Sequence, residues 1–230
     1  MRVCFVLAGV FTGSSIALCP SVASLFPDDG KDTLIIFPGG KLNSPNSLEQ
    51  MKNSIYDLVN EDNIDGTIIW SSSLSGSVNS TVVLKRFAEI LSKPLVTIDG
   101  KSDSFPKIPN VCFDAYEGSR FLIQHCITVH GARRILYLRG PLNHNSSIKR
   151  YQAYLDALKE NGIPINYNLI SEPTEWSQGG EGLRNMLEAR NLRPGRDFDM
   201  IVCASDLMTY ESEQVLKSYG YVVGEDVFIC

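Results

Sequence analysis

Side chains that could bind a small polar solute gather in one loop and in the helix predicted after it. The loop over 143–147 contains Asn143, His144 and further small hydrogen-bonding residues, and Arg150 follows in the first turn of the helix. Helix N-termini favour negative charge, so we expect this cation to have an external partner. A guanidinium donates two parallel hydrogen bonds, which suits a sugar or a similar molecule. A solvated or salt-bridged arginine is the alternative.

The stretch over 133–162 predicts the elements that would position these residues. The apolar run over 135–138 is typical of a parallel strand covered on both faces, and a Gly-Pro pair ends it. Ser146 or Ser147 could cap the amphipathic helix that follows. Open α/β sheets bind ligands at this kind of loop, between a strand's carboxyl end and a helix's amino end.

The rest of the chain repeats the alternation of strand and helix, which predicts parallel sheets. Strands are predicted at 3–10, 33–37, 65–70, 95–98, 111–113, 133–139, 165–170, 200–204 and 227–229. Helices are predicted at 14–26, 46–60, 80–92, 118–129, 147–161, 179–189 and 209–219. Pro20 is expected to kink or break the first helix. The first residues also resemble a secretory signal, but a doubly wound domain without its first strand would lose a core element, so we favour the strand.

Composition excludes several functional classes. The chain of 230 residues is 43% hydrophobic and 20% charged, which is ordinary for a globular protein, and its net charge of -5 argues against a sequence-independent grip on nucleic acid. No stretch reaches the roughly 20 apolar residues of a membrane span. The six cysteines lack metal-type spacing and are interpreted as buried free thiols in a reducing cytoplasm. Enzyme motifs and metal-ligand histidine spacing are absent, so we expect no catalysis, no metal and no cofactor.

Five segments carry a family resemblance that covers nearly the whole chain. They are PLVTIDG at 94–100, NVCFDAYEGSR at 110–120, HGARRILYLRGPLNH at 130–144, RYQAYLDALKENGI at 150–163 and DMIVCASDLMTYESEQVLKSYGYVVGEDV at 199–227. In order and spacing they resemble the ligand-binding core of the LacI/GalR repressors, which has the type I periplasmic-binding-protein fold. The resemblance implies a two-lobed α/β fold with parallel sheets flanked by helices.

The same resemblance implies where the lobes divide. It predicts an N-terminal lobe over 1–108 and a C-terminal lobe over 109–230, with the proline-containing linker at 103–109 as a crossover between them. The resembled fold continues beyond this point with strands and helices that complete both lobes. We therefore expect the C-terminal lobe to be incomplete in the sequence given.

The resemblance also implies ligand-binding residues. Arg150 matches the family arginine that hydrogen-bonds ligand, and Glu117 falls where some members place an acidic contact. Ser205 and Asp206 match a segment that usually reads Asn-Asp; the hydroxyl of Ser205 replaces an amide, so the ligand class does not carry over. Asp206 could instead cap the following helix. Loop position alone adds Phe11, Thr12, Ser71, Ser72 and Ser73. Trp176 could stack on a ligand, although covering a helix is the favoured interpretation.

Three sequence segments are more similar to one branch of the superfamily than to repressors. IIFPGGKLNSPNS at 35–47, IDGTIIWSSSLSG at 64–76 and RGPLNHNSSIKRYQAY at 139–154 resemble cytoplasmic sensory domains fused to GGDEF diguanylate cyclases or histidine kinases. This implies a homodimer that closes on a small polar ligand, controls an attached transcription or signalling output, and contacts neither nucleic acid nor membrane through this chain. A secreted periplasmic solute-binding protein for transport is the alternative, and an enzyme is the weakest hypothesis.

Overall fold

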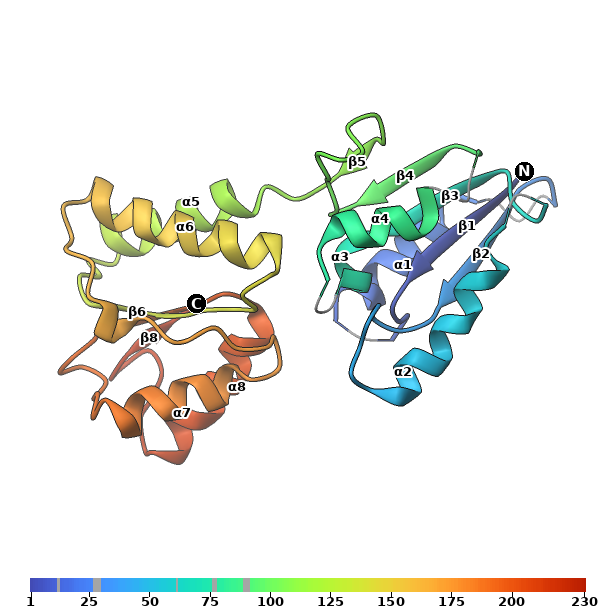
Figure 1. Cartoon of the computed structure of the whole chain (residues 1–230). Helices are drawn as coiled ribbons and strands as arrows, with labels where there is room; N and C mark the ends of the chain where they lie inside the picture. The colour runs from blue at the N-terminus through green and yellow to red at the C-terminus, as the bar shows by residue number, and fades with distance from the viewer. Residues whose placement is uncertain (12, 27–29, 61, 76–77, 89–91) are drawn as a thin grey trace. The chain divides into compact units, whose positions relative to one another are not determined.

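The computed structural model describes residues 1–11, 13–26, 30–60, 62–75, 78–88 and 92–230. The chain forms two compact units, Met1–Phe113 and Asp114–Cys230 (Figure 1). Both contain parallel sheets flanked by helices, so the fold class predicted from the alternating pattern is confirmed. None of the helices in the described part of the chain is long and apolar enough to cross a membrane.

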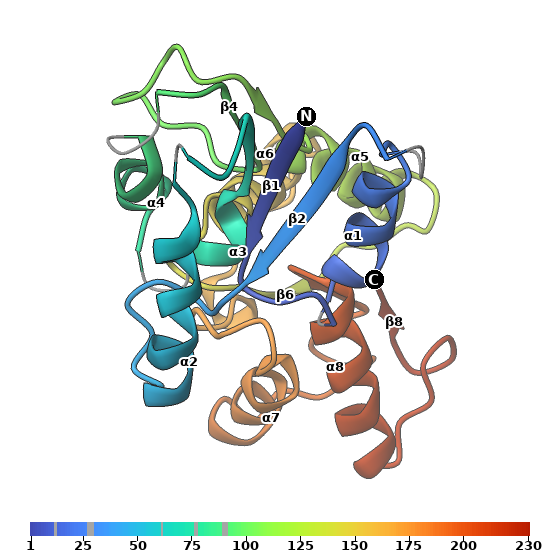
Figure 2. The ribbon, with the colours of Figure 1, turned by 90° about the vertical axis from the view of Figure 1, so that its right-hand side faces the viewer.

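The first unit is built on a five-stranded parallel sheet with the order β2-β1-β3-β4-β5. Its strands are β1 (Arg2–Leu7), β2 (Thr33–Pro38), β3 (Gly66–Trp70), β4 (Leu95–Ile98) and β5 (Asn110–Val111). Figure 2 shows β1 and β2 running side by side. Cys4, Phe5, Val6 and Leu7 of β1 are completely buried, as expected for a central parallel strand covered on both faces.

Helices cover both faces of this sheet. They are α1 (Ser15–Ala23), α2 (Ser47–Lys52), the 3-10 helix η1 (Asn53–Leu58), α3 (Ser71–Ser75) and α4 (Ser80–Ala88). Phe5 and Leu7 pack with residues of α1, whereas Cys4 and Val6 pack with residues of η1 and α4. The break expected at Pro20 does not occur, because α1 continues through it and the Pro20 carbonyl accepts a hydrogen bond from the Ser24 N–H at 2.9 Å.

Tyr56 joins the ends of β1 and β2 in the first unit. Its buried hydroxyl lies 3.0 Å from the Leu7 carbonyl oxygen and 2.9 Å from that of Gly40. A β-carbon on Gly39 would fall 2.4 Å from the Tyr56 ring, so the glycine is required for this approach. The tight packing explains why a glycine directly follows β2.

The second unit contains a three-stranded parallel sheet with the order β6-β7-β8. Its elements are α5 (Ala115–Thr128), β6 (Ile135–Leu138), α6 (Asn145–Glu160), the 3-10 helix η2 (Tyr167–Leu169), α7 (Gly179–Ala189), β7 (Met200–Cys203), α8 (Asp206–Ser218) and β8 (Phe228–Ile229). The helices α5 and α6 cover one face of the sheet, and α7 and α8 cover the other (Figure 1).

One local prediction differs from the structure. Residues 165–170, predicted as a strand, form η2 and a single bridge between Ile170 and Tyr137, because the Asn166 side chain accepts a hydrogen bond from the Asn168 N–H at 3.0 Å and turns the chain. The lobe boundary expected after residue 108 stays a prediction. Asn110 and Val111 pair with β4, so the first unit extends to Phe113.

The cysteines are all free thiols, but they are not all buried. Cys4, Cys19 and Cys126 are buried as expected, whereas Cys112 is exposed just after β5. The apolar pattern around Cys112 predicted a buried strand that the structure shortens to two residues.

Candidate functional site

The loop between β6 and α6 positions the residues that the sequence singled out. All four side chains of β6 are buried, and α6 begins at Asn145 with His144 as its N-cap residue. The predicted caps, Ser146 and Ser147, instead lie buried in the first turn. The helix starts earlier than expected because the His144 carbonyl already accepts a hydrogen bond from the Ile148 N–H at 3.0 Å.

Arg150 connects α6 to the end of β7. Its guanidinium donates a hydrogen bond to the carbonyl of Ala204, the residue that follows β7. The guanidinium carbon also lies 5.9 Å from the centre of the Trp176 ring, within the range of a cation–π interaction. The half-buried Arg150 is therefore held at the carboxyl ends of the strands, where open α/β sheets bind ligands.

Trp176 is the candidate residue that the sequence did not favour. Its ring lies 5.0 Å from the His144 ring in a T-shaped arrangement, in addition to its contact with Arg150. A β-carbon on Gly140 would fall 2.6 Å from the Trp176 ring, so the glycine after β6 lets the indole approach the loop. Local sequence carries no signal for this contact, because Trp176 and Gly140 are far apart in the chain.

Ser205 and Asp206 follow β7 beside the carbonyl that Arg150 contacts. Ser205 is the N-cap of α8, and its hydroxyl accepts a hydrogen bond from the Met208 N–H at 3.5 Å. The capping role considered for Asp206 therefore belongs to Ser205, while Asp206 is exposed in the first turn. The structure thus brings both residues to the strand ends near Arg150.

Two other predicted ligand residues of the second unit are exposed. Asn143 lies in the β6–α6 loop, next to His144. Glu117 lies in the first turn of α5, where its carboxylate is 3.7 Å from a guanidinium nitrogen of Arg120. In residues 114–230, which are all described, Glu117 forms no hydrogen bond or ion pair with Arg150.

The serines predicted in the first unit belong to a short helix, α3, and not to the loop that we expected. Ser73 accepts a hydrogen bond from the Ala8 N–H at 3.2 Å and donates one to the Trp70 carbonyl at 2.8 Å, which links the ends of β1 and β3. Ser72 accepts a hydrogen bond from the Trp70 indole at 3.0 Å. These hydroxyls therefore stabilise the strand ends themselves.

Ser71, Phe11 and Thr12 complete the predicted set. Ser71 is completely buried, and a β-carbon on Gly100 would fall 1.9 Å from its β-carbon, so it packs against the backbone. Phe11 is 86% exposed. Thr12 lies outside the described residues.

A stack of three tyrosines lies behind the Arg150 region. The Tyr137 ring of β6 stacks on Tyr154 at 4.6 Å and lies 5.7 Å from Tyr151, both on α6. Burial raises the pKa of Tyr137, and the nearby guanidinium groups of Arg150 and Arg139 act in the opposite direction. Tyr137 is therefore a neutral hydroxyl in an electropositive region.

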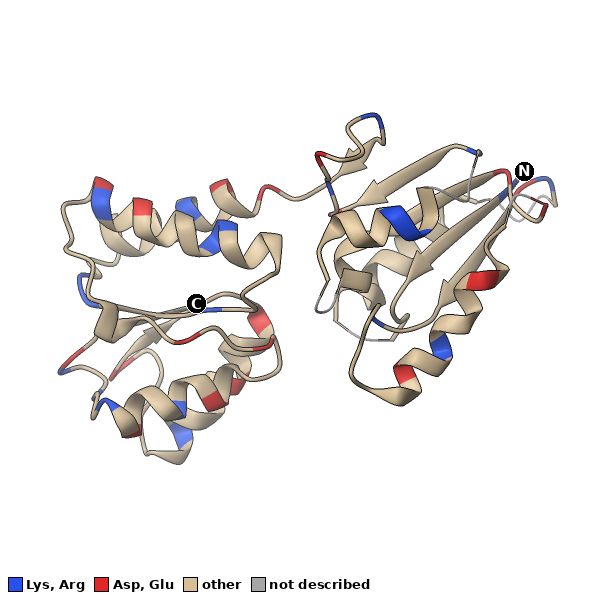
Figure 3. Ribbon diagram, viewed as in Figure 1, with Lys and Arg blue, Asp and Glu red and all other residues tan. Residues whose placement is uncertain are grey.

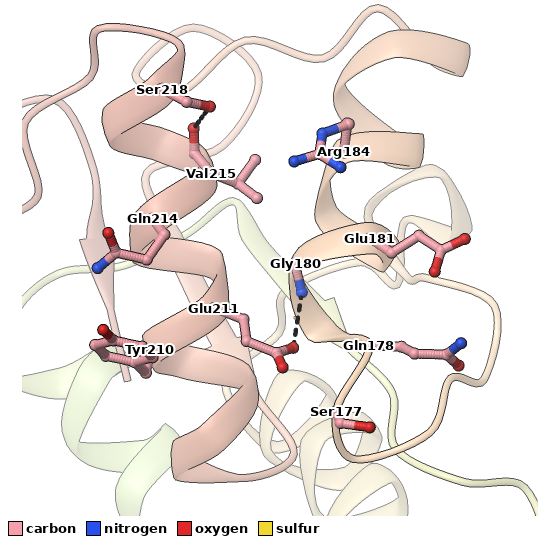
Figure 4. Close-up of a pocket in the computed structure, with 10 residues that line it drawn as sticks. All are labelled: Ser177, Gln178, Gly180, Glu181, Arg184, Tyr210, Glu211, Gln214, Val215 and Ser218. Atoms are coloured by element: carbon pink, nitrogen blue, oxygen red, sulfur yellow. Dashed lines mark hydrogen bonds between the residues drawn. The ribbon is translucent and has the colours of Figure 1, made fainter.

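A groove of about 330 Å³ lies elsewhere, between α7 and α8 (Figure 4). The Glu211 carboxylate points across it and accepts a hydrogen bond from the Gly180 N–H at 3.2 Å, while Arg184 lines it from α7. The groove contains none of the predicted ligand residues, so it is separate from the β6–α6 region.

Comparisons with known proteins agree with this architecture. Residues 41–229 match the model of the family described as periplasmic binding proteins and sugar binding domain of LacI family. The chain is 25% identical over 188 residues to the HTH-type transcriptional repressor PurR of Pasteurella multocida, covering 81% of this chain and 52% of the relative. It is 32% identical over 101 residues to the regulator AscG of Escherichia coli, covering 43% of this chain and 28% of AscG. The chain thus spans about half the length of PurR.

Solved structures are similar in fold. The lactose repressor bound to the anti-inducer ONPF matches with a TM-score of 0.74 at 18% identity, covering 100% of this chain and 78% of that one. The regulator CelR in complex with cellobiose matches with a TM-score of 0.72 at 20% identity, covering 99% of this chain and 66% of CelR. Because the family model matches more than half of the sequence, this chain belongs to the family of periplasmic binding proteins and LacI-type sugar-binding domains.

Proposed function

We propose that this chain is the ligand-binding sensory domain of a regulator, and that it binds a small polar molecule at the strand ends that carry Arg150. The observation that supports this most strongly is the placement of the Arg150 guanidinium, which is held by the Ala204 carbonyl and by the Trp176 ring. A guanidinium has five N–H donors. Only one polar partner occupies it within residues 114–230, so most of its donors are available to a ligand.

The surrounding residues would complete the ligand contacts of this unit. Trp176 supplies an aromatic wall. The ring of His144 packs against it and can donate or accept a hydrogen bond. Ser205, Asp206 and Asn143 add hydroxyl, carboxylate and amide groups at the same strand ends. Such a mixture of one apolar surface and a few polar groups is typical of small-molecule sites. Phe11, Thr12 and Ser71–Ser73 are weaker candidates, because the described serines are engaged within their own unit.

We further propose that ligand binding controls an output attached to this domain. A ligand with different affinities for two conformations shifts the balance between them, and the output follows that balance. A transcriptional output is supported by the HTH-type regulators among the relatives. A GGDEF or histidine-kinase output is supported by the resemblance of the sequence segments at 35–47, 64–76 and 139–154. The sequence of the gene on both sides of this chain distinguishes the two outputs.

The proposal includes a cytoplasmic homodimer that does not itself grip nucleic acid. Lysines, arginines, aspartates and glutamates are interspersed along α5, α6, α7 and α8 (Figure 3), and the chain carries a net charge of -5. Sequence-independent binding to nucleic acid needs a continuous basic face. If the protein were instead a secreted solute-binding protein, mass spectrometry of the native protein would find the first residues removed.

A thermal-shift screen tests the proposed site. Neutral sugars, including the cellobiose bound by CelR, and their acidic derivatives are added to the full-length protein and to the Arg150→Gln and Arg184→Gln variants. We expect a ligand to stabilise the wild type and Arg184→Gln, whose substitution lies in the α7–α8 groove, but not Arg150→Gln. Equal stabilisation of all three proteins would contradict the proposed site.

A further inference from the structure

A second arginine, Arg139, lies at the end of β6. Its backbone is held firmly, because its N–H donates to the Ser171 hydroxyl at 2.9 Å and its carbonyl accepts from the Thr174 hydroxyl at 3.0 Å. Its guanidinium carbon lies 4.3 Å from the centre of the Tyr151 ring, a close cation–π contact. Tyr151 directly follows Arg150 in α6. Arg139 thus follows β6 and contacts α6 one residue away from Arg150, and both guanidinium groups are half-buried.

Neither guanidinium has a carboxylate partner within residues 114–230, all of which the structure describes. Arg150 contacts a carbonyl and an indole ring, and Arg139 contacts a phenol ring. Four other arginines of this unit do form ion pairs. These are Arg120 with Glu160 at 2.8 Å, Arg134 with Asp199 at 3.4 Å, Arg190 with Glu172 at 3.9 Å and Arg196 with Asp197 at 2.7 Å. Within the same residues, Arg133, Arg184 and Arg193 also lack an ion pair, but they are exposed. Among the half-buried arginines of residues 114–230, Arg139 and Arg150 are therefore the two without a carboxylate partner.

Uncompensated charge of this kind is costly in a half-buried position. An aromatic face offsets part of that cost, but it does not accept the in-plane N–H donors of a guanidinium. Asp206 is the acidic side chain next to the Ala204–Ser205 segment; it is exposed, and the N-terminus of α8 stabilises its charge. No carboxylate of the second unit forms an ion pair with either guanidinium group. We therefore expect an anion from outside this unit to balance their charge.

Tyr137, on which both guanidinium groups act, gives an independent sign that this region lacks a partner for its polar groups. The Tyr137 hydroxyl is buried, with 1% of the residue exposed, and has no hydrogen-bond partner among the residues that the structure describes. Buried polar atoms without partners are rare, and each calls for an explanation. Cys203, whose charge would also act on Tyr137, supplies no anion, because burial raises the pKa of this thiol to about 11. Near Tyr137, therefore, two guanidinium groups lack a carboxylate partner and one buried hydroxyl lacks a hydrogen-bond partner among the described residues.

We propose that the ligand of this site is an anion: a small polyhydroxylated molecule whose carboxylate or phosphate is bound by Arg139 and Arg150 together. This inference rests on the proposed function and narrows its ligand class. A neutral sugar would leave both guanidinium charges unbalanced, whereas an oxyanion accepts parallel hydrogen bonds from a guanidinium fork. Arg150 would contact the ligand in either case, so Arg139 is the residue that selects for charge.

Calorimetry on the full-length protein, with matched ligands, tests whether the site prefers an acidic ligand to a neutral one. Each set contains a neutral hexose, the aldonic acid derived from it and its 6-phosphate, and inorganic phosphate is titrated separately. We expect an acidic member to bind at least about tenfold more tightly than its neutral parent, with an affinity that falls as salt is added. The aldonic acids and the phosphate esters distinguish a carboxylate ligand from a phosphate ligand.

Variants of Arg139 test whether its side chain causes the preference for acidic ligands. Arg139→Gln is expected to lower the affinity for the acidic ligand about tenfold without affecting any neutral ligand, and Arg139→Lys is expected to restore part of the preference. Arg120→Gln, which breaks an ion pair between α5 and α6, is the matched control and should bind as the wild type does. Far-ultraviolet circular dichroism and melting temperature confirm that each variant is folded.

The outcomes separate this inference from the proposed function. One outcome would contradict the anionic ligand and still support the sensory function. In that outcome, neutral sugars bind as tightly as their acids, and their affinity is lost in Arg150→Gln and kept in Arg139→Gln. An acidic ligand that binds Arg139→Gln and the wild type equally would also contradict this inference. No binding of any neutral or acidic member at about 10 mM would count against both proposals.

Discussion

Gly140 and Trp176 are in contact at the end of β6, where a β-carbon on the glycine would fall 2.6 Å from the indole ring. The same β-carbon would lie 3.0 Å from the Ser147 hydroxyl oxygen. This contact places the indole next to His144 and Arg150, and so it builds the aromatic wall of the candidate site.

Gly140→Ala should therefore destabilise the protein and weaken ligand binding. Because the neighbouring ring and hydroxyl must move, we expect the free energy of unfolding to fall by about 1–3 kcal/mol in a urea titration. Gly118→Ala is the control, since Gly118 lies inside α5 with nothing within 4 Å of an added β-carbon. Alanine there should stabilise the helix by up to about 1 kcal/mol. Equal effects of the two substitutions would argue against the Gly140 contact.

Trp176 should report ligand binding through its fluorescence. The chain has two tryptophans, and Trp70 lies in β3 of the first unit. In a Trp70→Phe variant, saturation with ligand should therefore shift or quench the remaining emission, because the Trp176 ring borders the proposed site. An emission spectrum that does not change while calorimetry detects binding would remove Trp176 from the site.

Removing the hydroxyl of Tyr137 and removing that of Tyr56 should change the free energy of unfolding differently. Tyr137→Phe deletes a buried hydroxyl that has no hydrogen-bond partner in the described part of the chain, so we expect the free energy of unfolding to stay constant or rise by about 1 kcal/mol. Tyr56→Phe deletes a hydroxyl that lies within hydrogen-bond distance of two carbonyls, and should cost about 1–2 kcal/mol. Urea titrations of the ligand-free variants measure both effects. A larger loss in Tyr137→Phe than in Tyr56→Phe would contradict the hydrogen-bond assignment.

The buried thiol of Cys203 should contribute to the loss of stability at high pH. Burial raises its pKa from 9.0 to about 11 in the folded state, so the folded protein retains this proton at a pH at which the unfolded chain releases it. The contribution of Cys203 to stability is therefore fully present below pH 9 and is lost as the pH rises toward 11. Unfolding of the wild type and of Cys203→Ala, compared from pH 8 to pH 11, isolates this effect from other titrations. A constant difference between the two proteins would contradict the raised pKa.

The sequence was sufficient to predict most of the strand and helix order, because periodic burial is a local property. The apolar run of β6 and the helical spacing of α7 are clear examples, and α7 has the predicted bounds. Local hydrogen bonds that compete with regular structure were not predictable, as in the turn at Asn166 and the short helix at Ser71. The roles of Trp176 and Arg139 depend on long-range contacts with Gly140 and Tyr151, which no local pattern encodes.

Nuclear magnetic resonance of the side-chain N–H groups during a ligand titration shows whether the ligand binds beside Arg150 and Trp176. We expect the resonances of the Arg150 Nε–H and the Trp176 indole N–H to shift on saturation, while those of Arg184 in the α7–α8 groove stay in place. Shifts confined to the groove, with Arg150 and Trp176 unchanged, would place the ligand elsewhere and contradict the account.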